Sequence, residues 1–123
     1  MLKTWKTVAF VGVRDAGKAR AFYGGTLGLR LVEDTPFALV YDSNGVTLRV
    51  SLVPTLTPAG FTVLGWEVPD MDEAIRTLAA AGVAFRRYEG IAQDERGVWT
   101  APGGTEVAWF EDPEGNILSL SRH

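Results

Sequence analysis

An apolar run, a tight turn and a second apolar run occur twice in this chain of 123 residues. The clearer copy is VAWFEDPEGNILSL at residues 107–120, where Pro113 and Gly115 mark the turn. Proline fixes φ at an early turn position, and glycine accepts the positive φ that closes the turn. The weaker copy, ALVYDSNGVTLRVSL, spans residues 38–52. The sequence therefore predicts that one structural unit is used twice, so that positions in the two halves can be compared.

The first half predicts one strand, one helix and three further strands. Asp15 follows a β-branched run as the expected N-cap of the helix, and Gly28 is its expected stop. Pro36 and the turn at residues 43–45 separate the last three strands. The expected elements are a strand at 7–13, a helix at 15–27, and strands at 29–33, 37–42 and 46–53.

The second half repeats this order after a linker at residues 54–60, which contains two prolines and a glycine. Asp70 and Glu73 predict a capping box, and the apolar stripe that follows predicts that Ile75 and Leu78 are buried against a sheet. Residues 90–104 have no counterpart in the first half, and such long loops are often functional. The expected elements are a strand at 61–68, a helix at 70–81, and strands at 83–88, 105–111 and 117–121.

Composition limits the classes of function. The hydrophobic content of 46% suits a single domain over residues 1–123, with one module at 1–53 and another at 61–123. A net charge of −3 without a long basic run argues against a nucleic-acid partner. No segment has the pattern of a membrane span or a signal peptide, so we expect a cytoplasmic protein with no membrane partner. The chain has no cysteine, and its one histidine is His123, which excludes disulfides and thiolate metal sites.

Taken together, these features resemble the vicinal oxygen chelate superfamily, which includes glyoxalase I, bleomycin-resistance proteins, fosfomycin-modifying enzymes and extradiol dioxygenases. The resemblance rests on the paired βαβββ units, on Ala21-Phe22-Tyr23 and Thr26-Leu27-Gly28 after the first strand, and on the Asp-Pro-Glu-Gly-Asn turn before the last strand. It covers almost the whole chain. It implies an α+β fold in which two βαβββ modules form a cupped mixed sheet around a cavity, with the helices outside.

The resemblance also implies where a metal would bind. In metal-using members each module supplies one ligand from its first strand and one from its last, usually His or Glu and in some members Gln. The first-strand ligand lies five residues before the valine of a Val-x-Asp ending, and the last-strand ligand lies three residues after the asparagine of the turn. Imidazole, carboxylate and thiolate are the donors that transition metals prefer. The four positions are Val8, Arg49, Val63 and Ser119, so we expect no metal and no other cofactor.

Strand alternation predicts which side chains face the cavity. If Val8 and Val63 point inward, every second residue of those two strands points inward as well. In the last strand of each module, the leucines and valines alternate with the inward residues, so we expect them to pack against the helices. Aromatic rings that reach the cavity would suit a flat ligand. The expected ligand-binding residues are Phe10, Tyr41, Arg49, Glu67, Trp99 and Ser119, and no catalytic residue is assigned.

Arg49 and Glu67 have more than one interpretation. The guanidinium of Arg49 could hold a carboxylate, phosphate or enolate oxygen through paired hydrogen bonds, or it could pair with Glu67 or reach solvent. Glu67 could act as a general base or as an ordinary ion-pair partner. The acidic residues at turns are interpreted instead as caps and turn acceptors. They are Asp15, Asp42, Asp70 and Asp112.

These observations favour a metal-free protein that binds a small anionic or aromatic molecule. The alternatives are a metal-dependent lyase, isomerase or dioxygenase, as in much of the superfamily, and a metal-free enzyme that uses Glu67 and Arg49. A regulatory or structural dimer without a ligand is a third class. We also expect a homodimer, because a small two-module chain has strand edges and exposed apolar residues to cover. Trp5, Phe61 and Trp99 are the residues expected to be exposed.

Overall fold

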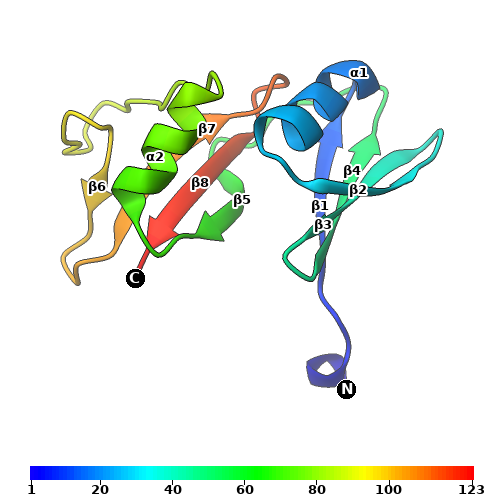
Figure 1. Cartoon of the computed structure of the whole chain (residues 1–123), viewed down its shortest axis with the longest axis horizontal. Coiled ribbons are helices and arrows are strands. Elements are labelled where there is room, and N and C mark those ends of the chain that lie inside the picture. The colour runs from blue at the N-terminus through cyan, green and yellow to red at the C-terminus, as the bar shows by residue number, and fades with distance from the viewer. The chain divides into compact units, whose positions relative to one another are not determined.

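The computed structural model describes all 123 residues as two compact units, Met1–Thr57 (unit 1) and Pro58–His123 (unit 2), shown in Figure 1. The boundary falls inside the segment predicted as a linker. Each unit contains one four-stranded mixed sheet, and the strand order is the same in both, with the first strand beside the last. The prediction of a repeated βαβββ unit is confirmed, and so is the α+β fold class.

Unit 1 follows the predicted order. Its first and last strands pair in parallel, and the other neighbours pair antiparallel, so the sheet order is β1-β4-β3-β2. The elements are the 3₁₀ helix η1 (Leu2–Thr4), β1 (Val8–Val13), α1 (Ala16–Ala19), the π-helix η2 (Arg20–Thr26), β2 (Arg30–Asp34), β3 (Ala38–Ser43) and β4 (Val46–Leu52).

The helix predicted at 15–27 is one α-helical turn that continues as a π-helix. Asp15 caps it, since its carboxylate accepts a hydrogen bond from the amide of Lys18 at 3.0 Å. The π-helical part contains Gly24, and a Cβ atom there would lie 3.5 Å from the hydroxyl of Tyr41. The rings of Tyr23 and Tyr41 lie 6.2 Å apart, and both residues are fully buried. The helix therefore packs closely on β3.

The core of unit 1 lies on the face of the sheet that this helix covers. Leu48 and Val50 of β4 are almost completely buried, and the residues between and beside them are more exposed. The alternation confirms the predicted parity of this strand, with leucine and valine on the covered face and Thr47, Arg49 and Ser51 on the open face.

Unit 2 has a sheet of order β5-β8-β7-β6, again with a parallel pair between its first and last strands. Asp70 caps its helix by accepting from the amide of Glu73 at 3.1 Å. The buried core residues Leu118, Leu120 and Phe110 share one face of the sheet. The elements are β5 (Thr62–Glu67), α2 (Met71–Ala80), β6 (Trp99–Thr100), β7 (Glu106–Glu111) and β8 (Ile117–Arg122).

Two predictions for unit 2 need correction, and the first concerns residues 83–88, which form no strand. Only one backbone hydrogen bond, from the amide of Arg86 to the carbonyl of Trp109, joins this segment to β7. The side chain of Gln93 bonds two further backbone groups of the segment, the amide of Tyr88 and the carbonyl of Arg86. A side chain thus takes the place of a strand ladder, and the short strand β6 forms later, inside the predicted loop.

The second correction concerns α2, which begins and ends close to the predicted limits but buries less than its apolar stripe indicates. Met71 is buried, whereas Ile75 and Leu78 are only partly buried. Ten residues of helix cover one part of a four-stranded sheet, so the flanks of the stripe stay accessible to water. No helix of the chain is both long and apolar enough to cross a membrane.

Candidate functional site

Arg49 lies at the centre of the open face of the unit 1 sheet. It pairs in register with Phe10 of β1 on one side and with Val40 of β3 on the other. Paired residues of neighbouring strands point to the same face, so these three side chains form a row across the sheet. The structure therefore brings together two predicted ligand-binding residues, Phe10 and Arg49.

Arg49 differs from two other arginines of unit 1, Arg20 of η2 and Arg30 of β2, because its side chain has no ion-pair partner in the unit. Arg20 forms an ion pair with Asp34 at 2.5 Å, and Arg30 forms one with Asp42 at 3.3 Å. No hydrogen bond or ion pair joins the side chain of partly buried Arg49 to another residue of unit 1. Phe10 beside it is 62% exposed. The face thus presents an unpaired guanidinium between two apolar side chains, an arrangement that suits an oxyanion attached to an apolar group.

Tyr41 does not join this row. It pairs in register with Leu48, so it points to the covered face of the sheet, opposite to Arg49. It is completely buried, and its hydroxyl has no hydrogen-bond partner. Burial raises the pKa of the Tyr41 hydroxyl, with Arg20 opposing and Asp34 adding to the shift. The structure therefore separates Tyr41 from the predicted ligand-binding face, because it lies at odd spacing from the inward positions of β3.

A corresponding row crosses the unit 2 sheet. Ser119 of β8 pairs with Gly65 of β5 and with Trp109 of β7. Ser119 and Arg49 therefore occupy equivalent central positions in the two sheets, as the aligned turns predict. Because Gly65 has no side chain, the Ser119 hydroxyl has space beside it. A Cβ atom added at residue 65 would lie only 2.7 Å from that hydroxyl oxygen. The row therefore has no side chain at its β5 position, Gly65, and a large indole at its β7 position, Trp109.

Three aromatic rings gather at the β7 end of this face. Trp109 contacts Tyr88 with ring centroids 5.7 Å apart and Trp99 with centroids 6.3 Å apart. We call these three residues the aromatic cluster. Trp99 is partly buried against Trp109, so it is not the exposed residue that the sequence predicts. The two indole rings are inclined by 31°, whereas Tyr88 meets Trp109 edge-on at 81°, so the flatter surface of the cluster is the one made by Trp99 and Trp109.

The hydroxyl of Tyr88 is buried and has no hydrogen-bond partner. Burial raises its pKa, the carboxylate of Glu111 adds to the rise, and Arg86 opposes it. The phenol therefore stays neutral at physiological pH and can donate a hydrogen bond. A buried polar group without a partner is rare in proteins, because each one costs about 1–3 kcal/mol.

Glu67 is placed by the structure on the same open face as Ser119. It lies two residues after Gly65 and pairs in register with Ser121. Its side chain is exposed, and no ion pair holds it within unit 2. Glu67, Trp99 and Ser119 are thus brought to one face of unit 2, although Trp99 stands at the far edge.

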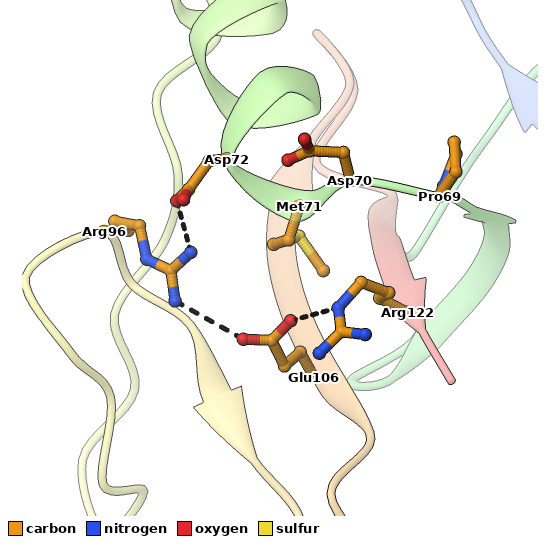
Figure 2. Close-up of a pocket in the computed structure, with 7 residues that line it drawn as sticks. All are labelled: Pro69, Asp70, Met71, Asp72, Arg96, Glu106 and Arg122. Atoms are coloured by element: carbon orange, nitrogen blue, oxygen red, sulfur yellow. Dashed lines mark hydrogen bonds and ion pairs between the residues drawn. The ribbon is translucent and has the colours of Figure 1, made fainter.

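A polar pocket of about 380 Å³ lies on the other side of unit 2, at the first turn of α2 (Figure 2). Most of its charged groups are already paired. Arg122 donates to Glu106 at 2.6 Å, and Arg96 donates to Asp72 at 2.5 Å. The lining residues are Pro69, Asp70, Met71, Asp72, Arg96, Glu106 and Arg122. None of the predicted ligand-binding residues lines this pocket.

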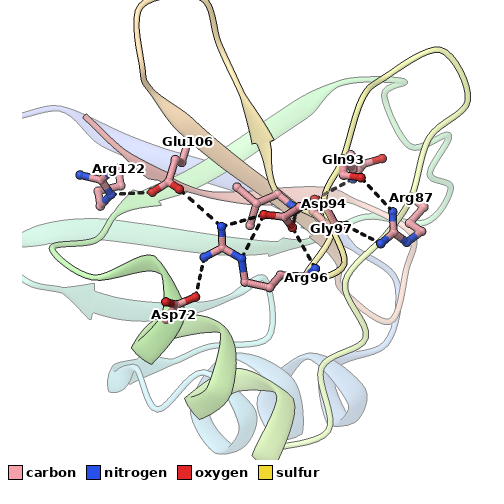
Figure 3. Close-up of polar contacts among 9 residues, drawn as sticks. Asp72, Arg87, Gln93, Asp94, Arg96, Gly97, Glu106 and Arg122 are labelled. Carbon is pink, nitrogen blue, oxygen red and sulfur yellow. Dashed lines mark hydrogen bonds and ion pairs between the residues drawn. The ribbon is translucent and has the colours of Figure 1, made fainter.

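Arg96 is the centre of the polar contacts in Figure 3. It donates to Asp94 from Nη2 at 2.7 Å and from Nε at 3.1 Å, and it pairs with Asp72 of α2 and Glu106 of β7. Asp94 and Asp72 raise the pKa of Arg96 above its usual value. These contacts attach the 90–104 loop to the sheet and to α2, so the loop is an ordered part of unit 2.

The four positions that the resemblance assigns to metal ligands carry no side chain that transition metals prefer. Val8 and Val63 supply only hydrocarbon, and the guanidinium of Arg49 repels a cation. Ser119 supplies a neutral hydroxyl, which binds transition metals weakly compared with imidazole or carboxylate. No group of three or more His, Asp or Glu side chains is arranged to hold an ion.

The repeated unit, its two sheets and the equivalent rows define a duplicated βαβββ protein. The family model for the Glyoxalase/Bleomycin resistance protein/Dioxygenase superfamily matches residues 7–120, and the chain belongs to this superfamily. No curated protein gave a significant match.

Solved structures with this fold cover nearly the whole chain. A member of the superfamily from Sphaerobacter thermophilus DSM 20745 is 27% identical, with a TM-score of 0.73 over 98% of this chain and 99% of that one. A glyoxalase family protein from Enterococcus faecalis is 16% identical, with a TM-score of 0.74 over 98% and 99%. Lactoylglutathione lyase from Agrobacterium tumefaciens is 16% identical, with a TM-score of 0.69 over 94% and 92%. The last two similarities show the fold alone.

Proposed function

We propose that the protein binds a small anionic or aromatic molecule without a metal ion, and that Arg49 binds the anionic group. The observation on which this rests is the unpaired guanidinium on the open face of unit 1. A charged side chain among apolar neighbours is unfavourable unless a partner neutralises it. Phe10 and Val40 supply no such partner. A ligand carboxylate or phosphate would supply it through two parallel hydrogen bonds.

The size of the expected effect follows from the type of contact. Hydrogen bonds to charged groups contribute about 1.5–3 kcal/mol, and each 1.4 kcal/mol changes a dissociation constant about tenfold. Removal of the guanidinium should therefore weaken binding by about 10- to 100-fold. Lysine keeps the charge but loses the fork of donors, so Arg49→Lys should fall between the wild type and Arg49→Ala.

The experiment is a thermal-shift screen of aromatic carboxylates, aliphatic carboxylates and phosphate esters, followed by calorimetric titration of the best compound with Arg49→Ala and Arg49→Lys. Arg76→Ala is the matched control, because Arg76 is an exposed arginine on α2. Support requires weakened binding in the Arg49 variants and unchanged binding in the control. Equal binding by all four proteins would refute the role of Arg49.

The competing hypothesis, a metal-dependent lyase, isomerase or dioxygenase, is tested on the same preparation. Protein purified without an affinity tag is analysed for metals and titrated with Zn²⁺, Mn²⁺, Fe²⁺ and Ni²⁺. We expect no stoichiometric metal and no effect of added metal on ligand affinity. One tightly bound transition metal per chain would overturn the proposed function.

A further inference from the structure

Gln93 makes three hydrogen bonds to backbone groups through its side chain. Its amide nitrogen donates to the carbonyl of Arg86 at 2.9 Å and to the carbonyl of Gly97 at 2.7 Å. Its side-chain oxygen accepts from the backbone amide of Tyr88 at 2.8 Å. One side chain therefore joins two separate backbone segments, residues 86–88 and the segment that leads into β6.

The two segments joined by Gln93 are those that hold the outer rings of the aromatic cluster. Tyr88 is bonded to Gln93 directly, and Trp99 forms an antiparallel bridge with the backbone of Gln93. Both rings contact Trp109 of β7, which is anchored in the sheet. Gln93 therefore connects the two segments that carry Tyr88 and Trp99, by a side-chain hydrogen bond to one and a backbone bridge to the other.

The chemistry of the contact requires glutamine. A primary amide has two N–H donors and one carbonyl acceptor, and all three meet a partner here. A carboxylate of the same shape would place negative charge against the carbonyls of Arg86 and Gly97 and would lose both donated bonds. The backbone of Gly97, whose carbonyl accepts one of these bonds, has φ +88°, a conformation that glycine adopts readily.

Further polar contacts hold Gln93 itself in place (Figure 3). The guanidinium of Arg87 donates to the carbonyls of Gln93 and Asp94. Asp94 accepts from the amides of Arg96 and Val98 at 2.9 and 3.0 Å, and Arg96 connects the turn to α2 and β7. The backbone at Gln93 and Asp94 is therefore connected to Arg87 and, through Arg96, to α2 and β7.

We propose that Gln93 is a positioning residue, which fixes the spacing of Tyr88 and Trp99 about Trp109 and so sets the width of the aromatic surface offered to a ligand. The part of this statement that concerns a ligand rests on the proposed function. The part that concerns ring geometry does not, and the two are measured separately.

Ring geometry is measured by circular dichroism of the protein without ligand. The electronic transitions of two indoles as close as Trp99 and Trp109 couple, and the resulting exciton band (the coupled signal) depends on the distance and angle between the rings. Trp99→Phe supplies the baseline without coupling. We expect Gln93→Leu and Gln93→Glu to lose most of the coupled signal at neutral pH, whereas Glu95→Gln, a change at an exposed residue of the same turn, should retain it. A wild-type signal in both Gln93 variants would refute the positioning role.

Acidification separates positioning from a general loss of structure. In the Gln93→Glu variant, the protonated carboxyl group can again accept from Tyr88 and donate to one carbonyl, so its coupled signal should return in part as pH falls. The signal of Gln93→Leu should not return. The charged neighbours Arg86, Arg87 and Asp94 are the same in both variants, so their titration cancels. Identical acid behaviour of the two variants, or their failure to fold at every pH, would contradict the proposal.

The ligand part is tested with the fluorescent anionic aromatic probe anilinonaphthalene sulfonate. We expect Gln93→Leu to weaken binding of the probe at least several-fold, with Glu95→Gln unchanged. If no protein binds the probe, the proposed function fails for this ligand class, and the dichroism result still decides the ring geometry. Unchanged binding with a lost coupled signal would show that the cluster does not contact the ligand.

Discussion

The hydroxyl oxygen of Ser119 lies 2.7 Å from the position that a Cβ atom on Gly65 would occupy, and its backbone carbonyl oxygen lies 3.1 Å from it. Real Cβ atoms essentially never come within 2.7 Å of another atom, and 3.1 Å is tighter than most of their contacts, so an alanine at this position would force the Ser119 hydroxyl to move. Gly65→Ala should therefore destabilise the protein by about 1–3 kcal/mol, the usual effect of added volume in a packed site. This exceeds the gain of about 0.4–1 kcal/mol from a stiffer unfolded chain. Urea unfolding measures the difference.

A double mutant identifies the contact responsible. Ser119→Ala removes the nearer of the two oxygen atoms and should have little effect by itself. Combined with Gly65→Ala, it should restore part of the lost stability and leave the strain against the backbone carbonyl. Strict additivity of the two changes would show that the Ser119 hydroxyl is not what excludes a side chain at Gly65.

The sequence predicted the central rows of both sheets because their positions follow from strand alternation and from the two aligned turns. Arg49 and Ser119 share one position in the repeat for this reason, and Leu48 and Leu118 are buried beside them. The aspartates also follow local rules. Asp112 accepts from the amides of Glu114 and Asn116 at 2.9 and 3.0 Å, as its turn predicts.

The sequence contained no local pattern that predicted contacts between separate segments of the chain. The apolar period of residues 83–88 indicates a strand, but the partner that satisfies its backbone is the side chain of Gln93. Nothing in the sequence near Gln93 marks it as a backbone partner. Tyr41 lies on the face opposite to the predicted one for a related reason, since its face depends on the register of β3 with β4 and on how η2 packs.

Substitutions at a fully buried and at a partly buried residue of unit 2 should differ in their effect on stability. Phe110→Ala should cost about 3–5 kcal/mol, because Phe110 is fully buried and contacts the rings of Trp66 and Phe85. Leu78→Ala should cost less than about 2 kcal/mol, because partly exposed side chains lose less apolar burial. Chemical denaturation of both variants provides the comparison. A larger effect at Leu78 would mean that α2 buries its stripe more fully than the structure shows.

Asp94 should make stability depend on pH in the acid range. Burial by itself would raise the pKa of Asp94, but hydrogen bonds from the side chain of Arg96 and from the amides of Val98 and Arg96 outweigh it, so the pKa lies below the ordinary value of 3.8. The unfolded chain then binds the proton more readily than the folded one. The stability that Asp94 contributes is therefore fully present above its ordinary pKa. It is lost as the pH falls through the lower pKa that Asp94 has in the folded protein.

Asp94→Asn tests this dependence. Urea unfolding between about pH 2 and pH 6 should show that the variant is less stable than wild type at the upper end, and that the gap narrows as the pH falls. Glu95→Gln is the control, because Glu95 is exposed beside Asp94 in the same turn. A gap of constant size across the range would show that the carboxylate contributes by shape rather than by charge.

Our last prediction is that the protein is a homodimer. Large apolar side chains are exposed in both units: Trp5 is 61% exposed, Phe37 76% and Phe61 68%. We propose that these side chains are buried against a second copy of the chain, because aromatic rings add apolar area to an interface and closed two-fold symmetry is the commonest arrangement of soluble assemblies. Sedimentation equilibrium at micromolar concentration should give about twice the chain mass of 13.3 kDa. Trp5→Ser and Phe61→Ser should each shift the equilibrium toward monomer, while Lys3→Ser, a change at another exposed residue, should not. A single 13.3 kDa species over the whole concentration range would exclude the dimer.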